Sequence, residues 1–445
     1  MKKKFIDIRD VINAHLVTGN KDPFRDIKYP DQENLVKKKI SLITELVNKN
    51  SNNKQANKFW SSILYHWVTR IVYDIIKCYF FFEKNLEKKK NYLIYNIDPS
   101  EFTKYESAYT EDIEKFLVFL AGEYIKKKKI SFQIKKKFIV NQSQKKFSQF
   151  HNNKIYSKSI LKKFYFFFSK LFFKYYKPKI ILDDVSLKHM DLLKVNLFLG
   201  QLPLLWSMPI ENLNNSYDLE KRVSFIRSIK KKDYFNDYLN SILIKVLPKD
   251  YLENFDKIFE YLLKTYSFKH KNYLTCFHNS PQRKIFIELM KINKTKVFIC
   301  QHGGMYGFLK NMMGEDSERL ASSNYLTWGW KRLNKDKKFA AIKFLTLRKR
   351  NDEVKKLNKV LIVSNLRTNY FNKISAQPSV PSICDENWKN VSKFCFFLNE
   401  KFKSKISIRY LKKSQNSGFI FNEKKFPKFV EFDHAKNSLE DVLNE

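Results

Sequence analysis

Before residue 270, hydrophobic residues recur at intervals of three and four, which is the spacing of one buried helix face. The pattern is clearest between residues 60 and 82. Its predicted buried face holds Trp60, Ile63, Leu64, Trp67, Ile71, Ile75 and Ile76. The same spacing predicts helices at 34–48, 108–127, 191–206, 218–247 and 251–266. Residues 1–30 are polar and poorly periodic, and 85–110 is predicted to be a turn-rich link, so the N-terminal region is expected to be helix-rich.

After residue 270 the pattern changes to short apolar runs. Residues 272–277 and 296–300 predict two strands. Between them, Ser280 and Pro281 predict the start of a helix that runs to about residue 292, because Ser caps helices well and Pro suits the first turn. A strand, a helix and a second strand predict a βαβ unit with a parallel strand pair. Ligands in such sheets bind beyond the carboxyl ends of the strands, where residues 301–307 are expected to lie.

The last third of the chain shows a second group of α/β elements. Strands are predicted at 324–328, 359–364, 406–411 and 429–432, with a helix at 388–402 and another beginning at 438. A change in composition near residue 355 divides the chain into two predicted domains, 1–350 and 355–445. The second has three predicted strands, whereas doubly wound sheets usually have about five or six. We therefore expect an incomplete C-terminal domain.

Glycine is unevenly distributed. The chain has nine glycines, and five of them lie between positions 303 and 329. Glycine permits positive φ angles and a close approach of the backbone to a ligand. At a βα junction, freed N–H groups can also bind an anion. The substrate-binding residues predicted in this loop are Gln301, Gly303, Gly304, Tyr306 and Gly307.

His302 is the predicted catalytic residue of this loop. Histidine can accept a proton from a hydroxyl group near neutral pH. Glu315, Asp316 and Glu318 follow closely, and one of them is expected to orient His302 or to act as the base; Glu315 and Glu318 are the preferred candidates. The alternatives are a structural histidine and acidic residues on a solvated helix surface. His278 is expected to serve in a cap or turn.

Two arginines are candidates for binding a donor phosphate. Arg367 follows the strand predicted at 359–364, and Arg409 lies in the strand predicted at 406–411. Arginine binds phosphate through two parallel hydrogen bonds. Pairing with ordinary surface carboxylates is the alternative for both.

Composition and charge limit the functions and partners to be expected. Hydrophobic residues make up 43% of the chain, which is typical of a globular protein. The formal charge is +40, but only 12 of the 85 basic residues are arginine, which argues against a nucleic-acid partner. The charge fits a solvated lysine-rich surface, or attraction to an anionic membrane or donor. Five cysteines without a CxxC pair fit a reducing compartment, and neither a zinc site nor a disulfide framework is expected.

Two motifs resemble a known family. Gln-His-Gly-Gly-Met-Tyr-Gly at 301–307 and Tyr-Leu-Thr-Trp-Gly-Trp at 325–330 resemble the leptospiral O-antigen type of surface-polysaccharide transferase. The resemblance covers about residues 30–445. It implies a GT-B-like fold, in which two Rossmann-like domains enclose the active site. It also implies transfer of a nucleotide-activated sugar to a lipid-linked or glycan acceptor in O-antigen or capsule synthesis.

The resemblance further implies an enzyme without a bound metal, whose nucleotide-sugar is a substrate and not a cofactor. We expect it to work in the cytoplasm, with the inner face of the cytoplasmic membrane as a further location. The chain departs from the family in its opening strand, in the segment after Arg409, and in the short C-terminal domain. The alternative function is therefore a catalytically inactive or truncated relative that acts as a binding or scaffold protein.

Overall fold

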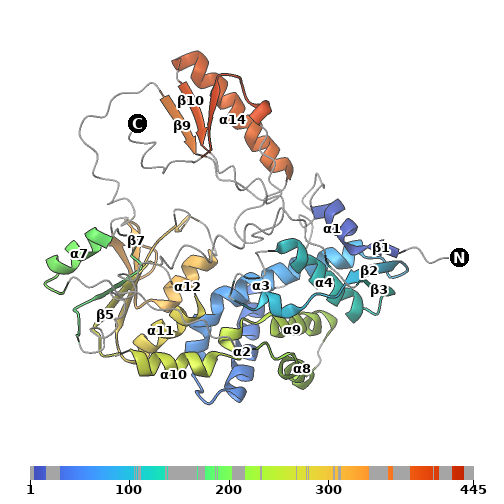
Figure 1. The fold of residues 1–445 in the computed structure, drawn as a ribbon, viewed down its shortest axis with the longest axis horizontal. Coiled ribbons are helices and arrows are strands. Elements are labelled where there is room, and N and C mark those ends of the chain that lie inside the picture. The colour runs from blue at the N-terminus through green and yellow to red at the C-terminus, as the bar shows by residue number, and fades with distance from the viewer. Residues whose placement is uncertain are drawn as a thin grey trace.

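The structure is a computed structural model, and it describes the chain in segments. These are residues 5–16, 31–104, 106, 108, 112–135, 138, 168, 176–185, 187, 189–202, 216–230, 233–266, 268–276, 278, 280–303, 306–308, 312–339, 359–363, 381–403, 405–409 and 423–434. Within them the strands form three sheets, and every paired strand is parallel (Figure 1). With helices between the strands, the protein has an α/β fold of Rossmann-like arrangement.

The largest sheet carries the glycine-rich loop. Its strand order is β4-β5-β6-β7-β8. The strands are β4 (Ile181–Asp183), β5 (Asn272–Thr275), β6 (Lys296–Cys300), β7 (Asn324–Trp328) and β8 (Asp336–Phe339). Helix α11 (Pro281–Ile292) connects β5 to β6, and the Ser280 side chain accepts a hydrogen bond from the N–H of Arg283 at 3.2 Å. The predicted βαβ unit and the start of its helix are confirmed.

Strands β4 and β8, at the two edges of this sheet, escape prediction from the sequence. β4 has three residues, and β8 has the sequence Asp-Lys-Lys-Phe, so neither shows an apolar run of useful length. β8 follows β7 after residues 329–335 alone, although parallel strands are usually joined by a dozen or more residues. The contacts that hold this short connection belong to the site described below.

A three-stranded parallel sheet lies at the N-terminal end. Its strands, in the order β1-β2-β3, are β1 (Phe5–Asp7), β2 (Asn91–Tyr95) and β3 (Phe132–Lys135). The prediction of a turn-rich link at 85–110 is wrong at β2. The poorly periodic residues 1–30 contain β1 and helix α1 (Ile8–Leu16). Strands of three to five residues are too short to show a reliable period.

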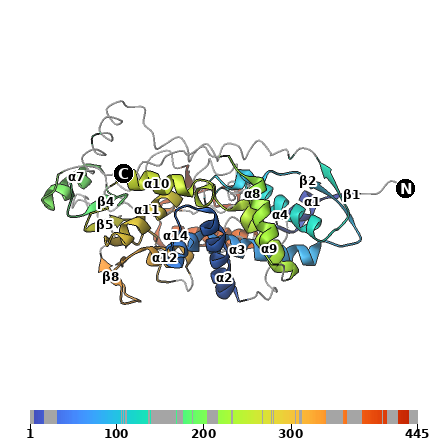
Figure 2. The same ribbon diagram turned by 90° about the horizontal axis from the view of Figure 1, so that it is seen from below.

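Helix α3 (Asn57–Asn85) lies between the five-stranded and the three-stranded sheets (Figures 1 and 2). Residues on all sides of it are buried, as expected of a helix inside a core. It packs against α2 (Gln32–Asn50), α4 (Ile113–Lys127), α9 (Tyr234–Val246), α11 and α12 (Met313–Ala321). One hydrophobic core therefore spans both sheets.

The helix predicted at 218–247 is two helices. These are α8 (Leu219–Ser228) and α9, and the chain between them is extended at Ile229. Asp233 caps α9 by accepting a hydrogen bond from the N–H of Asn236 at 2.8 Å. The remaining elements of this part are η1 (Pro99–Phe102), α7 (His189–Phe198), η3 (Lys249–Tyr251) and α10 (Phe255–Thr265).

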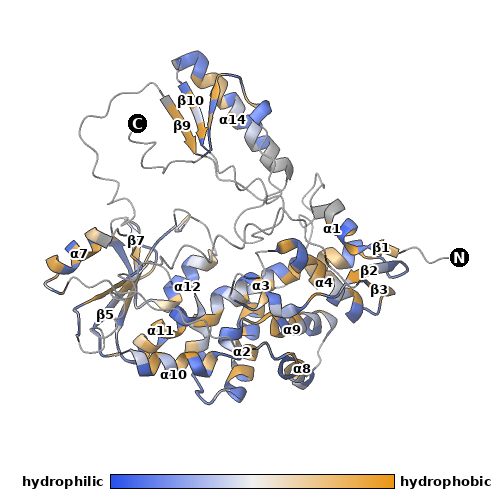
Figure 3. Ribbon diagram, in the orientation of Figure 1, coloured by the Kyte–Doolittle hydropathy of each residue, from blue (hydrophilic) through white to orange (hydrophobic). Residues whose placement is uncertain are grey.

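The C-terminal elements have a hydrophobic core of their own. They are β9 (Lys359–Val363), α14 (Pro381–Phe402), β10 (Lys405–Arg409), η6 (Glu423–Lys425) and β11 (Val430–Asp433), with the sheet order β11-β10-β9. Hydrophobic residues dominate β9 (Figure 3), and Cys395 of α14 packs with Ile406 and Ile408 of β10. The helix predicted from residue 438 lies outside the described residues. Among the described helices, none is both long and apolar enough to cross a membrane.

Candidate active site at the carboxyl ends of the five-stranded sheet

The predicted loop begins with Gln301, directly after β6. Gln301 is buried, and its side-chain amide forms hydrogen bonds to Gly303, Trp328 and Trp330. Nε2 donates to the carbonyl of Gly303 at 2.8 Å, and Oε1 accepts from the backbone N–H of Trp328 at 3.0 Å and from Nε1 of Trp330 at 2.8 Å. Gln301 thus fixes the loop against the end of β7. Its role in substrate binding stays a prediction.

His302 lies against the carboxylate of Glu318, which comes from α12. Nδ1 of His302 is 2.8 Å from Oε1 of Glu318, and the histidine side chain is 25% exposed whereas the glutamate is fully buried. The ring of Tyr306 meets the imidazole edge-on, with centroids 5.3 Å apart. Among the acidic residues expected to orient His302, the structure therefore brings Glu318 to it.

Two tyrosines hold the Glu318 carboxylate in place. Tyr306 donates to Oε1 at 3.1 Å, and Tyr325 donates to Oε2 at 2.9 Å. Burial raises the pKa of Glu318, and the hydrogen bonds from His302 and both tyrosines oppose this rise. Burial, followed by the charge of Glu318, raises the pKa of Tyr306 and of Tyr325 far above the usual range. Both hydroxyls are consequently proton donors at neutral pH.

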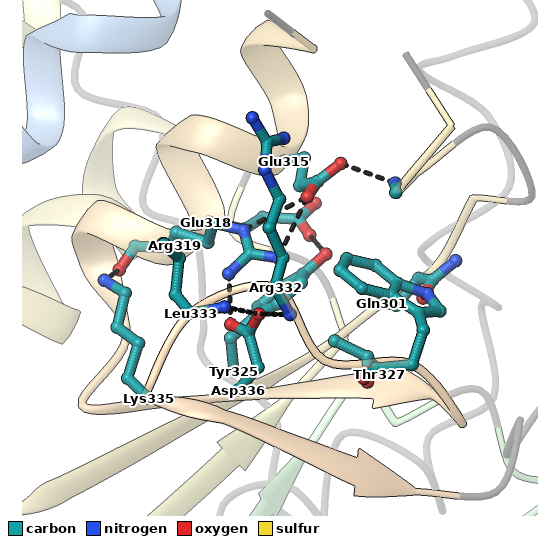
Figure 4. Close-up of polar contacts among 12 residues, drawn as sticks. Gln301, Glu315, Glu318, Arg319, Tyr325, Thr327, Arg332, Leu333, Lys335 and Asp336 are labelled. Atoms are coloured by element: carbon teal, nitrogen blue, oxygen red, sulfur yellow. Dashed lines mark hydrogen bonds and ion pairs between the residues drawn. The ribbon is translucent and has the colours of Figure 1, made fainter. Parts of the chain in front are cut away.

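Glu315 also lies on α12 and holds the backbone of the loop. Its Oε2 accepts a hydrogen bond from the N–H of Gly307 at 2.8 Å. Its Oε1 accepts from Nε and Nη2 of Arg319 at 3.1 and 3.0 Å. Both carboxylate oxygens are therefore engaged inside the protein (Figure 4). The structure shows Glu315 as a residue that positions the loop, and its catalytic role stays a prediction.

Arg319 extends this network to the short connection between β7 and β8. Its Nη1 pairs with the buried Asp336 at the start of β8 (Figure 4). The other oxygen of Asp336 accepts from the N–H groups of Arg332 and Leu333 at 2.8 and 2.7 Å. The guanidinium also lies 5.3 Å from the ring centroid of Trp330. These contacts turn the chain sharply enough for β8 to run parallel to β7.

Glycines in the loop and at the start of α12 make room for aromatic rings. Gly307 has a φ of +84°, and a Cβ there would lie 2.8 Å from Cε2 of Trp330. A Cβ at Gly314 would lie 2.7 Å from the hydroxyl of Tyr306. At these two positions close packing against aromatic rings requires glycine, and ligand binding by the glycine-rich loop stays a prediction. Gly304 lies outside the described residues.

The two predicted phosphate-binding arginines have different outcomes. Arg409 ends β10, and its Nη1 lies 2.5 Å from Oδ2 of Asp433 on the adjacent strand β11. Arg409 therefore forms the ion pair with a carboxylate that was the alternative to phosphate binding. Phosphate binding by Arg409 stays a prediction. Arg367 lies outside the described residues.

A second polar cluster is buried between α3, α11 and the chain near η1. Nζ of Lys284 donates to both oxygens of Glu106, at 2.7 and 2.8 Å. Tyr251 donates to the same carboxylate, and Nδ1 of His66 lies 3.5 Å from it. Burial alone would raise the pKa of Glu106, but the charge of Lys284 and the hydrogen bond from His66 bring it to about 2. Sequence spacing misses this group because the partners of Glu106 lie 40 to 178 positions away from it.

His278 follows β5 and is buried against α12. Its Nε2 lies 3.0 Å from the hydroxyl of Ser317. Burial, with the charges of Lys284 and His66, lowers the pKa of His278 well below its ordinary value. The imidazole is consequently neutral at physiological pH and serves packing between β5 and α12.

At the end of β4, Asp183 forms a further polar group that sequence analysis misses. Its Oδ2 accepts a hydrogen bond from Tyr273 at 2.5 Å and lies 3.1 Å from Nε of Arg283. Burial raises the pKa of Asp183 to about 6, against the pull of Arg283. The neighbouring Asp184 has a φ of +51°. The only sequence signal for this group would have been strand β4, which is too short to recognise.

Comparison with known proteins identifies the family. A family model described as LIC12162 family transferase matches residues 17–445, a range that includes both the five-stranded sheet and the C-terminal elements. Comparison with curated proteins and with solved structures gave no match.

Proposed function

We propose that this chain, which belongs to the LIC12162 family of transferases, transfers a sugar from a nucleotide-activated donor to a lipid-linked or glycan acceptor in surface-polysaccharide synthesis. The observation that carries the proposal is the contact between His302 and Glu318. A partly exposed imidazole held by a buried carboxylate, at the carboxyl end of a parallel strand, is suited to general-base catalysis.

His302 would act on the acceptor hydroxyl. Nδ1 lies 2.8 Å from a carboxylate oxygen of Glu318, and the charge of that carboxylate would hold the proton on this nitrogen. Nε2, which lies 3.5 Å from the hydroxyl of Tyr306, would act as the base. The hydroxyl proton passes to Nε2 while the acceptor oxygen bonds to the anomeric carbon of the donor. The bond from that carbon to phosphate breaks, and its electron pair leaves with the nucleotide. Glu318 stabilises the imidazolium that forms.

The donor phosphates would bind to the glycine-rich loop and to two arginines of the predicted C-terminal domain. The backbone of residues 303–307 is the proposed cradle, with Arg367 and Arg409 as the proposed cationic partners. In this proposal the fold is GT-B-like, and the enzyme works at the inner face of the cytoplasmic membrane. The loop could also bind the acceptor, because glycine-rich backbone accommodates either ligand.

The test is sugar transfer by the purified full chain with nucleotide-sugars as donors and membrane lipid extracts as acceptors. The His302→Ala variant should lose about 10²- to 10⁴-fold in kcat. His434→Ala is the matched control, because the His434 side chain is also 25% exposed and also lies near a glutamate, Glu423. Full activity of His302→Ala would contradict the assignment of His302 as the base.

The second candidate is a binding or scaffold protein without turnover. It is favoured by the way Gln301 in the loop and Glu315 on α12 are engaged inside the protein. Saturable binding of a nucleotide-sugar without its hydrolysis or transfer would support this function. Turnover of any nucleotide-sugar that depends on His302 would exclude it.

A further inference from the structure

The amino-terminal edge of the five-stranded sheet, opposite the His302 end, is strongly basic. Each of the first three strands is preceded or begun by two exposed lysines. These are Lys177 and Lys179 at β4, Lys269 and Lys271 at β5, and Lys294 and Lys296 at β6. We call these six residues the basic edge.

The lysines of the basic edge lie side by side because the strands are in register. Nδ2 of Asn272, at the start of β5, donates to the carbonyl of Lys179 at 2.9 Å. The N–H of Lys296 donates to the carbonyl of Lys271, also at 2.9 Å. The segments 176–181, 266–272 and 291–297 contain neither Asp nor Glu. The edge therefore presents positive charge without carboxylates of its own to neutralise it.

Exposed apolar side chains lie beside this charge. Phe198 at the end of α7 is 91% exposed, and Leu197 is 60% exposed. Nζ of Lys179 donates to the carbonyl of Leu199 at 3.1 Å, which fixes the end of α7 to the basic edge. Ile292, two residues before Lys294, is 56% exposed. Exposed apolar side chains that lie next to one another, as Leu197 and Phe198 do, are a feature of surfaces that contact a partner.

Helix α7 is apolar on two sides, not one. Leu192, Val195 and Leu199 pack with Cys276 and Cys300 against the sheet. On the solvent side, Met190, Leu197 and Phe198 are exposed together with Lys194. An ordinary surface helix would be polar on this side. Figure 1 shows α7 at the outer end of the five-stranded sheet, and the hydrophobic residues of α7 are visible in Figure 3.

We propose that the basic edge together with Leu197, Phe198 and Ile292 docks the protein onto a membrane that contains anionic lipids. Stable peripheral binding needs two signals, and here lysines attract the headgroups while apolar side chains enter the interface. A nucleic acid fits less well, because these segments contain no arginine and the exposed side chains beside the lysines include Leu197, Phe198 and Ile292. His302 lies at the other end of strands about 16 Å long and remains accessible.

The purpose of this contact rests on the proposed function, since a lipid-linked acceptor would be met at the membrane. The contact itself is tested without any enzymatic assay. The full chain is floated with vesicles of phosphatidylcholine, and with vesicles of phosphatidylcholine and phosphatidylglycerol. We expect binding to the mixed vesicles, weakened by added salt.

Two variants test the surface. The triple charge reversal Lys177→Glu, Lys271→Glu and Lys296→Glu should lower partitioning to the mixed vesicles by tenfold or more, on the order expected for several lysines near an anionic surface. The double variant Leu197→Ser and Phe198→Ser should also lower it.

Matched controls change exposed residues elsewhere. Lys38→Glu, Lys54→Glu and Lys89→Glu make the same change of charge, and Leu219→Ser with Leu263→Ser removes two exposed leucines. Both control variants should bind the mixed vesicles as the unchanged protein does. Circular dichroism verifies that each variant folds.

Three outcomes overturn the proposal, and a fourth concerns the proposed function alone. An equal loss in the charge-reversal control would show that net charge alone drives binding. No vesicle binding, with a DNA shift that the edge variants abolish, would make the surface a nucleic-acid site. No vesicle binding, with a dimer that Leu197→Ser and Phe198→Ser dissociate, would make it a contact between copies. Vesicle binding without sugar transfer would contradict the proposed function and leave the membrane contact intact.

Discussion

Nδ1 of His302, at the end of β6, lies 2.8 Å from Oε1 of the fully buried Glu318 on α12. The two residues are sixteen positions apart, and the segment that separates them contains four of the nine glycines. Tyr306 and Tyr325 hold the carboxylate from either side. The imidazole is therefore oriented by a group that is itself fixed, which is the arrangement that a general base requires.

The first prediction concerns the charge of Glu318. Glu318→Gln keeps the shape of the side chain but removes the charge that orients His302 and stabilises its protonated form. We expect kcat for sugar transfer to fall about 10²-fold, with a smaller change in KM. Steady-state kinetics measure this. Glu45→Gln, at an exposed position of α2, is the control.

The contact between His302 and Glu318 also predicts that the effects of substituting the two residues are not additive. If Glu318 acts through His302, then adding Glu318→Gln to His302→Ala should cost little more activity than His302→Ala alone. Losses that multiply in the double variant would show that Glu318 acts independently of His302.

The second prediction separates backbone strain from steric clash in the loop. Gly307 and Gly329 both have positive φ angles, +84° and +87°, but only the Cβ of an alanine at 307 would clash, at 2.8 Å from Trp330. Gly329→Ala should lower the free energy of unfolding by about 1 kcal/mol through strain alone. Gly307→Ala should lower it by about 1–3 kcal/mol more.

Urea unfolding of both variants measures the difference. Gly122→Ala, on α4, adds a Cβ whose nearest neighbours are 4.0 Å away, and it should not destabilise the protein. Equal losses at Gly307 and Gly329 would contradict the assigned packing against Trp330.

The third prediction concerns pH and the buried Glu106. Its pKa of about 2, against an ordinary 4.5, means that the folded protein favours the carboxylate. This contribution, about 3 kcal/mol, is fully present above pH 4.5 and is lost as the pH falls from 4.5 toward 2. The variant Glu106→Gln should therefore be far less stable than the unchanged protein at pH 7, and the difference should shrink below pH 4.5.

Urea midpoints at pH 7, 5 and 3 test this dependence on Glu106. Glu33→Gln removes a carboxylate that is 77% exposed and paired with Lys37, and it should leave the midpoints unchanged at each pH. A stability gap for Glu106→Gln that stays constant down to pH 3 would contradict the ion pair with Lys284.

The fourth prediction concerns the guanidinium group of Arg319. Its guanidinium binds Glu315 and Asp336 at once, which a lysine ammonium cannot do with the same geometry. Arg319→Lys should lower the free energy of unfolding by about 2–3 kcal/mol. Arg332→Lys, at an exposed position, is the matched control. Equal stability of the two variants would show that Arg319 does not hold the connection between β7 and β8.

Sequence pattern predicts the elements that have a strong local signal. The βαβ unit of β5, α11 and β6 is recognisable because apolar runs flank a helix that begins at Ser280 and Pro281. Glycine scarcity elsewhere points to the loop after β6. The strands β1, β4 and β8 are missed because three or four residues, some of them charged, show no period.

The sequence by itself determined the α/β class, the position of His302 at a strand end and the need for glycine beside it. Only the tertiary structure decided that Glu318 faces His302 while Glu315 holds Gly307, because a difference of three positions on α12 turns the two side chains to different neighbours. It also decided the pairing of Lys284 with Glu106 across 178 positions. Local periodicity reports which face of an element is buried, whereas a partner distant in sequence is set by how the elements pack.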